Sequence, residues 1–259
     1  MNISQFIFSG ITNGAIYALI AICIVILYNV TGIINFAQGE FTMLGAMIMI
    51  TLVDADMNRP LAAILTIILV MAIGTIIYRL ALHPLRNNKN VLVMIMVTLG
   101  IGIIIKGISL VIWGTDSRSL APFTPGKPFK ILNASITPQD LWIWGVCVAV
   151  ILFIFILFDK TYFGMSFRAC MSNKKASQLM GIHTDRMAMV AFALSGGVAA
   201  LGGIVMAPLT FAQYDMGLML GLKGFVAAVL GGMTGAPAAI VGGFTLGLLE
   251  SFGAGFISS

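Results

Sequence analysis

Long apolar runs alternate with short polar connections along the whole sequence. Seven runs are long enough to form membrane-spanning helices, which need about 20 apolar residues. They cover residues 6–28, 33–53, 60–78, 91–113, 141–158, 187–211 and 236–256. An eighth run, 216–233, is interrupted by glycines and is predicted to be a short or discontinuous span. The pattern predicts an all-α polytopic bundle of about eight spans, with discontinuous helices, in one transmembrane domain that covers residues 1–259.

The composition excludes a soluble domain. The chain is 59% hydrophobic and only 9% charged, whereas soluble domains carry about 25% charged residues. A transmembrane β-barrel would need alternating strands of ~10 residues, and these runs do not alternate. The net charge of +5 does not indicate nucleic-acid binding, because the cations lie in short connections without an aromatic and basic surface. The cysteines are interpreted as small apolar fillers: Cys23, Cys147 and Cys170.

The positive charges in the connections predict the orientation. Connections 79–90 and 159–186 hold eight Lys and Arg residues and are predicted to be cytoplasmic. Connections 54–59 and 114–140 hold four and are predicted to lie outside, as is the N-terminus. The eight are Arg79, Arg86, Lys89, Lys160, Arg168, Lys174, Lys175 and Arg186, and the four are Arg59, Arg118, Lys127 and Lys130.

The outer connection 114–140 is the longest on its side, and its prolines predict an absence of regular structure. It is either a docking surface or a plain linker. The prolines are Pro122, Pro125, Pro128 and Pro138.

The sequence contains no recognisable catalytic constellation. The two histidines, His83 and His183, lie in different connections, and there is no Gly-x-x-x-x-Gly-Lys-Ser/Thr phosphate loop. The chain is therefore predicted not to be an enzyme. Energy for any transport would come from a partner or from an ion gradient.

A few charged residues interrupt the apolar runs, where charge is costly and usually functional. Lys106 and Glu250 lie near enough to helix ends to reach the membrane surface. Lys223, between two glycines, either meets a substrate carboxylate, pairs with an acid or lies at the interface. The four charged residues are Glu40, Lys106, Lys223 and Glu250.

Glu40 belongs to a polar cluster at the start of the second run. On a helix, Asn35, Gln38 and Gly39 would share one face. A polar face with a glycine is typical of a break that lines a transport path. The alternative is interhelical hydrogen bonding that only holds the bundle together.

Small residues predict close packing of several helices. Gly-x-x-x-Gly pairs occur at 10 and 14, 231 and 235, and 243 and 247. The sixth run repeats a small residue at every fourth position: Ala191, Ser195, Ala199, Gly203 and Ala207.

The connection 159–186 contains a short helix signal. Ser172 and Asn173 are favourable N-cap residues, and Gly181 is a favourable residue just after a helix end. A helix of two turns is marginal alone, so it must lie on the membrane interface or in a groove of a partner protein. Its apolar stripe would consist of Ala176, Leu179 and Met180.

Three separated motifs carry a family resemblance. The first is Asn13-Gly-Ala-Ile-Tyr-Ala-Leu19, followed by Val30-Thr-Gly-Ile-Ile-Asn-Phe-Ala-Gln-Gly-Glu-Phe41. The second runs from Phe167-Arg-Ala-Cys through Leu179-Met-Gly-Ile182, and the third is Phe225-Val-Ala-Ala-Val-Leu-Gly-Gly232, continuing to Gly235-Ala-Pro and Gly242-Gly243. Together they resemble the H-type permease subunit of bacterial branched-chain amino acid ABC importers. The Asn-Phe-Ala-Gln-Gly-Glu form favours the H-type over its M-type partner.

The resemblance implies a multi-pass permease of the bacterial inner membrane, which carries branched-chain or related amino acids by alternating access. The cytoplasmic loop 159–187 would carry a coupling helix that is seated in a groove of an ATPase subunit. The coupling residues would be Arg168, Asn173, Lys174, Lys175, Ala176, Leu179, Met180 and Gly181, and the translocation path would include Asn13, Asn35, Gln38, Glu40 and Lys223.

The implied partners are a related M-type permease subunit, two ATPase subunits and a periplasmic substrate-binding protein. This chain would need no cofactor, since the ATPases would hold ATP and Mg. Members of the family usually continue with another span and a basic tail, whereas this sequence ends at Ser259. An ion-coupled transporter or channel and a purely structural membrane subunit remain as alternatives, and only the ABC importer requires an ATPase partner.

Overall fold

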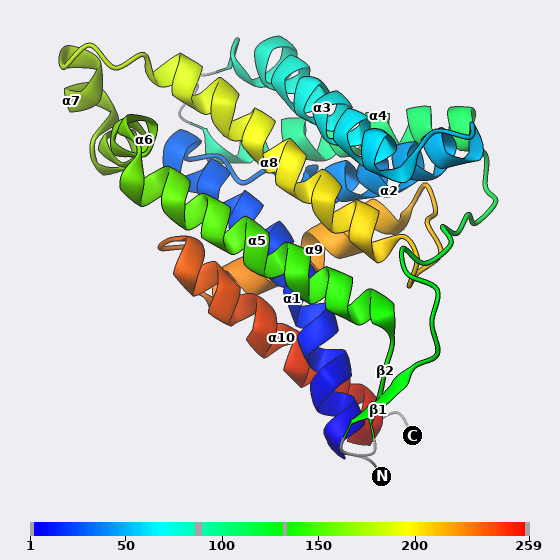
Figure 1. The fold of residues 1–259 in the computed structure, drawn as a ribbon. Helices are drawn as coiled ribbons and strands as arrows, with labels where there is room; N and C mark the ends of the chain where they lie inside the picture. The colour runs from blue at the N-terminus through cyan, green and yellow to red at the C-terminus, as the bar shows by residue number, and fades with distance from the viewer. Residues whose placement is uncertain (1–2, 86–89, 132–133, 257–259) are drawn as a thin grey trace.

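The computed structural model describes residues 3–85, 90–131 and 134–256, and this part of the chain is almost entirely helical (Figure 1). Within it, six helices are long and apolar enough to cross a membrane. Two further helices in the bundle are shorter: α2 (Gln38–Asp54) has 17 residues and α9 (Met216–Leu230) has 15. The six are α1 (Ile3–Thr31), α3 (Arg59–Ile77) with its π-helical extension η1 (Tyr78–Leu82), α4 (Val91–Trp113), α5 (Pro138–Lys160), α8 (Thr184–Met206) and α10 (Ala236–Phe256). The predicted helical bundle is confirmed, and six of the eight expected spans reach full length.

Helix α1 is the centre of the bundle. Every residue from Gly14 to Leu27 is buried, and α10, α8, α9 and α5 pack around it. The contact with α10 is the most extensive (Figure 1). Two of the predicted Gly-x-x-x-Gly pairs, 10/14 and 243/247, meet there, since Gly243 lies against the backbone of Ala18 and Gly247 against that of Gly14. The missing side chains let the two backbones approach closely.

The small-residue repeat of the sixth run packs α8 against α2 and α3. Gly203 lies against the backbone of Thr42, and a Cβ at Gly45 would lie 2.6 Å from Ala200 Cα. Helix α8 ends at Met206 rather than at the predicted residue 211. Pro208 explains the early end, because proline cannot continue a helix.

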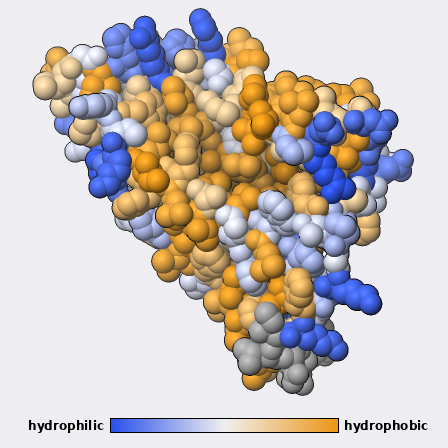
Figure 2. Space-filling view, in the orientation of Figure 1, coloured by the Kyte–Doolittle hydropathy of each residue, from blue (hydrophilic) through white to orange (hydrophobic). Residues whose placement is uncertain are grey.

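The outer surface of the bundle is apolar. Figure 2 shows hydrophobic residues over the middle of the molecule, with hydrophilic residues gathered toward its margins. Helix α4 is attached along a narrow stripe, and its other faces carry exposed hydrophobic side chains. This surface suits contact with lipid or with other membrane helices. The stripe consists of Met94, Thr98, Ile101, Ile105 and Ser109.

The connections gather at the two ends that the charge pattern predicts. Thr31, Asn90 and Lys174 line one pocket, so both basic connections lie at the same end of the bundle. Arg86 and Lys89 of the first basic connection lie outside the described residues. At the other end, Arg59 Nη1 donates a hydrogen bond to the backbone carbonyl of Pro122 at 2.8 Å.

The outer connection contains a small hairpin, which corrects the expectation that its prolines exclude regular structure. Strand β1 (Phe129–Ile131) pairs antiparallel with β2 (Ala134–Ile136). The hairpin falls in the proline-free stretch between Pro128 and Pro138. It lies beside the start of α1, because Gln5 Oε1 accepts a hydrogen bond from the backbone N–H of Ser135 at 2.7 Å.

Candidate functional site

The chain leaves the helical conformation between α1 and α2. Helix α1 ends at Thr31, Gly32 adopts a positive φ of 72°, and α2 begins only at Gln38. The side chain of Asn35 accepts a hydrogen bond from the backbone N–H of Ala37 at 3.1 Å, in a turn typical of asparagine. The expected helix start at residue 33 is therefore wrong, and Asn35 does not share a helical face with Gln38.

A buried polar network joins this turn to α8. Gln38 Nε2 donates to the backbone carbonyl of Ser195 at 3.2 Å, and Ser195 Oγ donates to Gln38 Oε1 at 2.8 Å. Asn35 Nδ2 donates to Gln38 Oε1 at 3.5 Å, and both amide side chains are almost fully buried. These bonds have the geometry expected of interhelical hydrogen bonding. A place for Asn35 and Gln38 on the transport path stays a prediction.

Glu40 lies where two helices begin. It belongs to the first turn of α2, and its carboxylate lies against Gly217 in the first turn of α9. Gly39 and Gly221 meet backbone to backbone beside it. Only 3% of Glu40 is exposed, and its Oε2 has no hydrogen-bond partner. A buried carboxylate oxygen without a partner is costly, so this cluster is chemically incomplete within the chain.

Lys106 on α4 borders the same cluster. Its ammonium group lies 5.5 Å from the centre of the Tyr214 ring, a cation–π arrangement. Lys106 and Asp215 are the charged groups that act electrostatically on Glu40. One turn earlier on α4, a Cβ at Gly102 would lie 3.8 Å from Glu40 Cγ. Helix α4 thus forms the wall of the Glu40 cluster.

Lys223 has a partner within the chain. Its Nζ donates to Glu250 Oε1 at 2.5 Å and to the Tyr17 hydroxyl at 3.0 Å, and that hydroxyl donates to Glu250 Oε2 at 2.7 Å. The three side chains tie α9, α10 and α1 together. Pairing with an acid was one of the three alternatives for Lys223, and its place on the path stays a prediction.

The structure gathers some of the predicted path residues and separates others. Asn13 lines a pocket in the N-terminal half of α1 together with Thr12 and Asp140. It lies one turn from Tyr17, away from the α1–α2 turn. The residues that lie together are Asn35, Gln38 and Glu40.

Helix α7 (Lys174–Leu179) confirms the short helix predicted in the connection 159–186, together with its ends. The Asn173 side chain caps it by accepting a hydrogen bond from the backbone N–H of Ala176 at 3.0 Å. At the other end, Gly181 has a φ of 82° and its N–H bonds to the carbonyl of Gln178 at 3.1 Å. The N–H of the next residue closes the last turn, which completes a Schellman motif.

The predicted apolar stripe of α7 is exposed on the surface of the described chain. Leu179 is 90% exposed and Met180 is 82% exposed, and Ala176 is exposed beside them. Lys174 and Lys175 are exposed as well. The helix projects at one end of the molecule, away from the main bundle (Figure 1). A capped helix with an unoccupied apolar stripe is suited to a groove on another protein.

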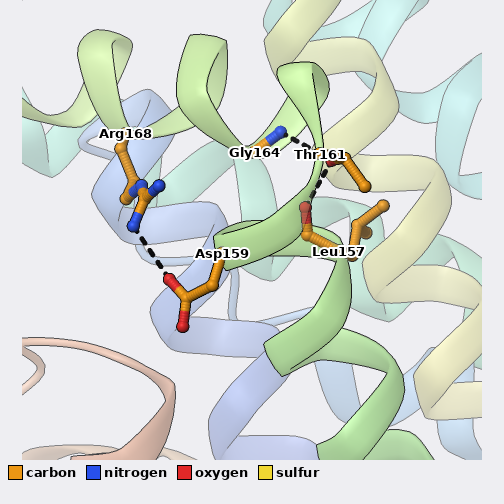
Figure 3. Close-up of polar contacts among 5 residues, drawn as sticks. All are labelled: Leu157, Asp159, Thr161, Gly164 and Arg168. Carbon is orange, nitrogen blue, oxygen red and sulfur yellow. Dashed lines mark hydrogen bonds and ion pairs between the residues drawn. The ribbon is translucent and has the colours of Figure 1, made fainter.

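The corner that carries α7 contains a helix that the sequence reading did not predict, α6 (Tyr162–Ser172). Thr161 caps it by accepting a hydrogen bond from the Gly164 N–H at 3.0 Å, and Arg168 pairs with Asp159 at 2.8 Å across the corner (Figure 3). Gly164 lies against the backbone of Phe158, where a side chain would not fit. Thr161 and Gly164 were the available signals for a helix start and a tight corner.

The sequence did not show which polar residues pair with one another, because the partners lie far apart along the chain. Tyr17 and Glu250 are 233 residues apart, and Ser195 and Gln38 are 157 apart. No local pattern connects such pairs. Among the described residues, no group of three or more His, Cys, Asp or Glu side chains is arranged to hold a metal ion.

Comparison with known proteins places this geometry in a family context. A family model described as branched-chain amino acid transport system / permease component matches residues 6–259. The high-affinity branched-chain amino acid transport system permease protein LivH of Salmonella typhimurium is 32% identical, over 98% of this chain and 87% of its own length. The corresponding protein BraD of Pseudomonas aeruginosa is also 32% identical, over 96% of this chain and 86% of its own length. The solved structure of PsaBC from Streptococcus pneumoniae in complex with Fab aligns with 96% of this chain and 91% of its own chain, at a TM-score of only 0.39 and 16% identity.

Proposed function

Because this chain belongs to the family of permease components of branched-chain amino acid transport systems, we propose that it is the membrane-spanning subunit of an ATP-binding-cassette importer. The importer carries branched-chain or related amino acids across the cytoplasmic membrane. The two related proteins compared above are named as permeases of high-affinity branched-chain amino acid transport. The helices of this chain supply the length and apolar surface that such a subunit needs.

The exposed stripe of α7 is the structural observation that carries the proposal. The helix is capped at both ends, and Leu179 and Met180 face outward without a partner among the described residues. Seating this stripe in an ATPase groove removes apolar surface from water, at about 25 cal/mol per Å². The basic residues Lys174 and Lys175 lie in its first turn and favour an acidic rim on that groove.

The proposed assembly contains two ATPase subunits, a related M-type permease subunit and a periplasmic binding protein. The ATPases hold ATP and Mg and hydrolyse ATP. Their closure moves the coupling helices together, and the two permease subunits rock around a central path. The binding protein supplies most of the selectivity, which suits a membrane domain with few polar side chains.

We place the translocation path beside the turn between α1 and α2. Irregular backbone at membrane depth is tolerated where it borders protein or water, and Glu40 there has an oxygen without a partner. The same observation supports the second candidate function, an ion-coupled transporter, because such proteins need an ionisable group near the membrane midplane. The two functions differ in their need for an ATPase.

Co-purification with an ATPase tests the proposal. The tagged wild-type chain is purified from its native membrane in mild detergent, and the Leu179→Asp variant is purified in parallel. The wild type should retain ATPase subunits, and the variant should lose them while still inserting in the membrane, because a charge would replace the buried contact. Lys160→Gln is the matched control, since it changes a charge in the same connection outside α7. Retention of the ATPases by Leu179→Asp, with wild-type transport, would exclude α7 as the coupling helix.

A further inference from the structure

Two lysine–glutamate combinations lie within the described helices. We call Lys223 with Glu250 the closed pair, because the two side chains bond directly, and Lys106 with Glu40 the open combination. Lys223 and Glu250 form a direct ion pair at 2.5 Å. Glu40 instead keeps a carboxylate oxygen without a partner, while the ammonium group of Lys106 rests over an aromatic ring. The closed pair satisfies its own charges. The open combination leaves a buried carboxylate oxygen without a hydrogen-bond partner, which is costly unless something else binds there.

Glu40 lies near the middle of the membrane. Tyr17 is the midpoint of the 29-residue helix α1, and Lys223 bonds to it. Gly217, which touches the Glu40 carboxylate, is six positions from Lys223 on α9, or about 9 Å along a helix axis. The open carboxylate is therefore well inside the hydrocarbon region, where a free charge needs a specific partner.

The surroundings of Glu40 are those of a site for charged groups. The first turns of α2 and α9 meet there, and the backbone N–H groups of a first helical turn carry partial positive charge. Transport proteins bind charged groups where discontinuous helices begin at this depth. Glu40 is itself 3% exposed, with its unpartnered oxygen directed at the start of α9.

We propose that Glu40 and Lys106 bind the zwitterionic head group of the transported amino acid. The open carboxylate oxygen of Glu40 accepts the α-ammonium group, and the Lys106 ammonium group binds the α-carboxylate. One α-amino acid carries both charges on the same carbon, so it satisfies both residues and adds no net charge at membrane depth. Asp215 precedes by two residues the Gly217 that lies against Glu40 and acts electrostatically on it. A second acid near the site further favours an incoming ammonium group. This assignment rests on the proposed function.

Helix α4 provides access to the site. Gly102 places no side chain over Glu40, and Lys106 follows one turn later on the same helix. Because α4 is buried along a narrow stripe only, it can move away from α2 without disturbing the α1–α10 core. Leucine, isoleucine and valine share this head group, so the site binds all three amino acids. Other parts of the importer distinguish their side chains.

Uptake by the whole complex tests the site. The complete importer is reconstituted in liposomes with saturating binding protein and radiolabelled L-leucine, and leucine uptake and ATP hydrolysis are measured together. Glu40→Gln and Lys106→Met should each lower leucine uptake at least tenfold while stimulated ATP hydrolysis stays within twofold of wild type. The amount of leucine carried per ATP therefore falls. Lys106→Arg, which keeps the cation, should retain more uptake than Lys106→Met.

Glu250→Gln is the matched control, because it makes the same change in the closed pair. It should lower the thermal stability of the complex, while uptake per assembled complex stays within twofold of wild type. If Glu40→Gln does not assemble, Lys106→Met alone tests the site. It should assemble, because Lys106 extends from the half-exposed face of α4. Wild-type uptake per ATP in both Glu40→Gln and Lys106→Met would overturn the site. Absence of ATP-dependent leucine uptake in the wild type would instead overturn the proposed function.

Discussion

Glycines determine how closely the two most extensively packed helices approach. A Cβ at Gly243 would lie 2.5 Å from both the backbone nitrogen and the Cα of Ala18. Backbone atoms cannot move aside as the end of a side chain can. The contact therefore depends on residues that have no side chain, and this holds on both α1 and α10.

Gly243→Val should destabilise the α1–α10 contact by about 2 kcal/mol, the usual size of an overpacking penalty. The measurement is the melting temperature of the purified protein in detergent. Gly145→Ala is the control, since nothing lies within 4 Å of a Cβ at that position, and alanine favours a helix by ~1 kcal/mol over glycine. Equal melting temperatures for Gly243→Val and wild type would contradict the packing described here.

Cys170 on α6 interacts with Ser177 on α7, so the reactivity of its thiol depends on how α7 packs against α6. Burial raises the pKa of Cys170, and a hydrogen bond with Ser177 and the charge of Lys174 partly oppose this shift. A raised pKa means less thiolate at neutral pH, and the thiolate is the reactive form. Maleimide labelling at pH 7 should therefore be slow and should accelerate toward pH 9. If Cys170 is labelled at pH 7 as fast as an exposed cysteine introduced by Ser172→Cys, its pKa is not raised.

At the scale of elements, α7 depends on its two ends. It has six residues, and a helix of that length is not stable alone. Asn173 and Gly181 hold its ends through bonds within the chain, so the apolar stripe is already oriented before any partner binds. Binding of a partner to this preformed surface therefore costs less conformational entropy.

Gly181→Val should uncouple transport, because a β-branched side chain resists the positive φ at this position. The expected result is normal membrane insertion with loss of substrate-stimulated ATP hydrolysis, measured on the purified complex. Gly181→Asn is the control, because asparagine tolerates this conformation and should retain most of the stimulation. If Gly181→Val is stimulated as strongly as Gly181→Asn, the end of α7 does not matter for coupling.

The elements that local chemistry determines could be predicted from the sequence. Hydrophobic run length identified the long helices, and Pro60 marked the start of α3 as expected. Asn173 and Gly181 identified the ends of α7 for the same local reason. The turn before Gln38 could not be placed correctly, because the side chain of Asn35 competes with the helix for backbone bonds.

The polar clusters were less accessible to prediction. Lys223 and Glu250 are 27 residues apart on different helices, and Tyr17 joins them from 206 residues away. Their contact follows from how α1, α9 and α10 pack, which no single helix encodes. The isolated charges could be recognised as unusual at membrane depth, but whether each is paired or open required the three-dimensional arrangement.

At the scale of the whole molecule, the basic connections lie at one end of the bundle and the hairpin at the other. The charge bias predicts that the first end is cytoplasmic. A membrane-impermeant maleimide added to intact cells should label Lys127→Cys and Lys130→Cys but not Lys174→Cys or Lys175→Cys. Labelling at position 174 from outside would reverse the orientation.

Transport by this chain is proposed to draw its energy from ATP hydrolysed by the partner ATPases. Uptake of radiolabelled L-leucine is measured in liposomes that contain this chain with its permease partner and ATPases, with binding protein outside. We expect leucine to accumulate only when ATP and Mg are enclosed in the lumen, and not from a proton or sodium gradient alone. Leucine accumulation driven by an ion gradient without ATP would contradict ATP hydrolysis as the source of energy.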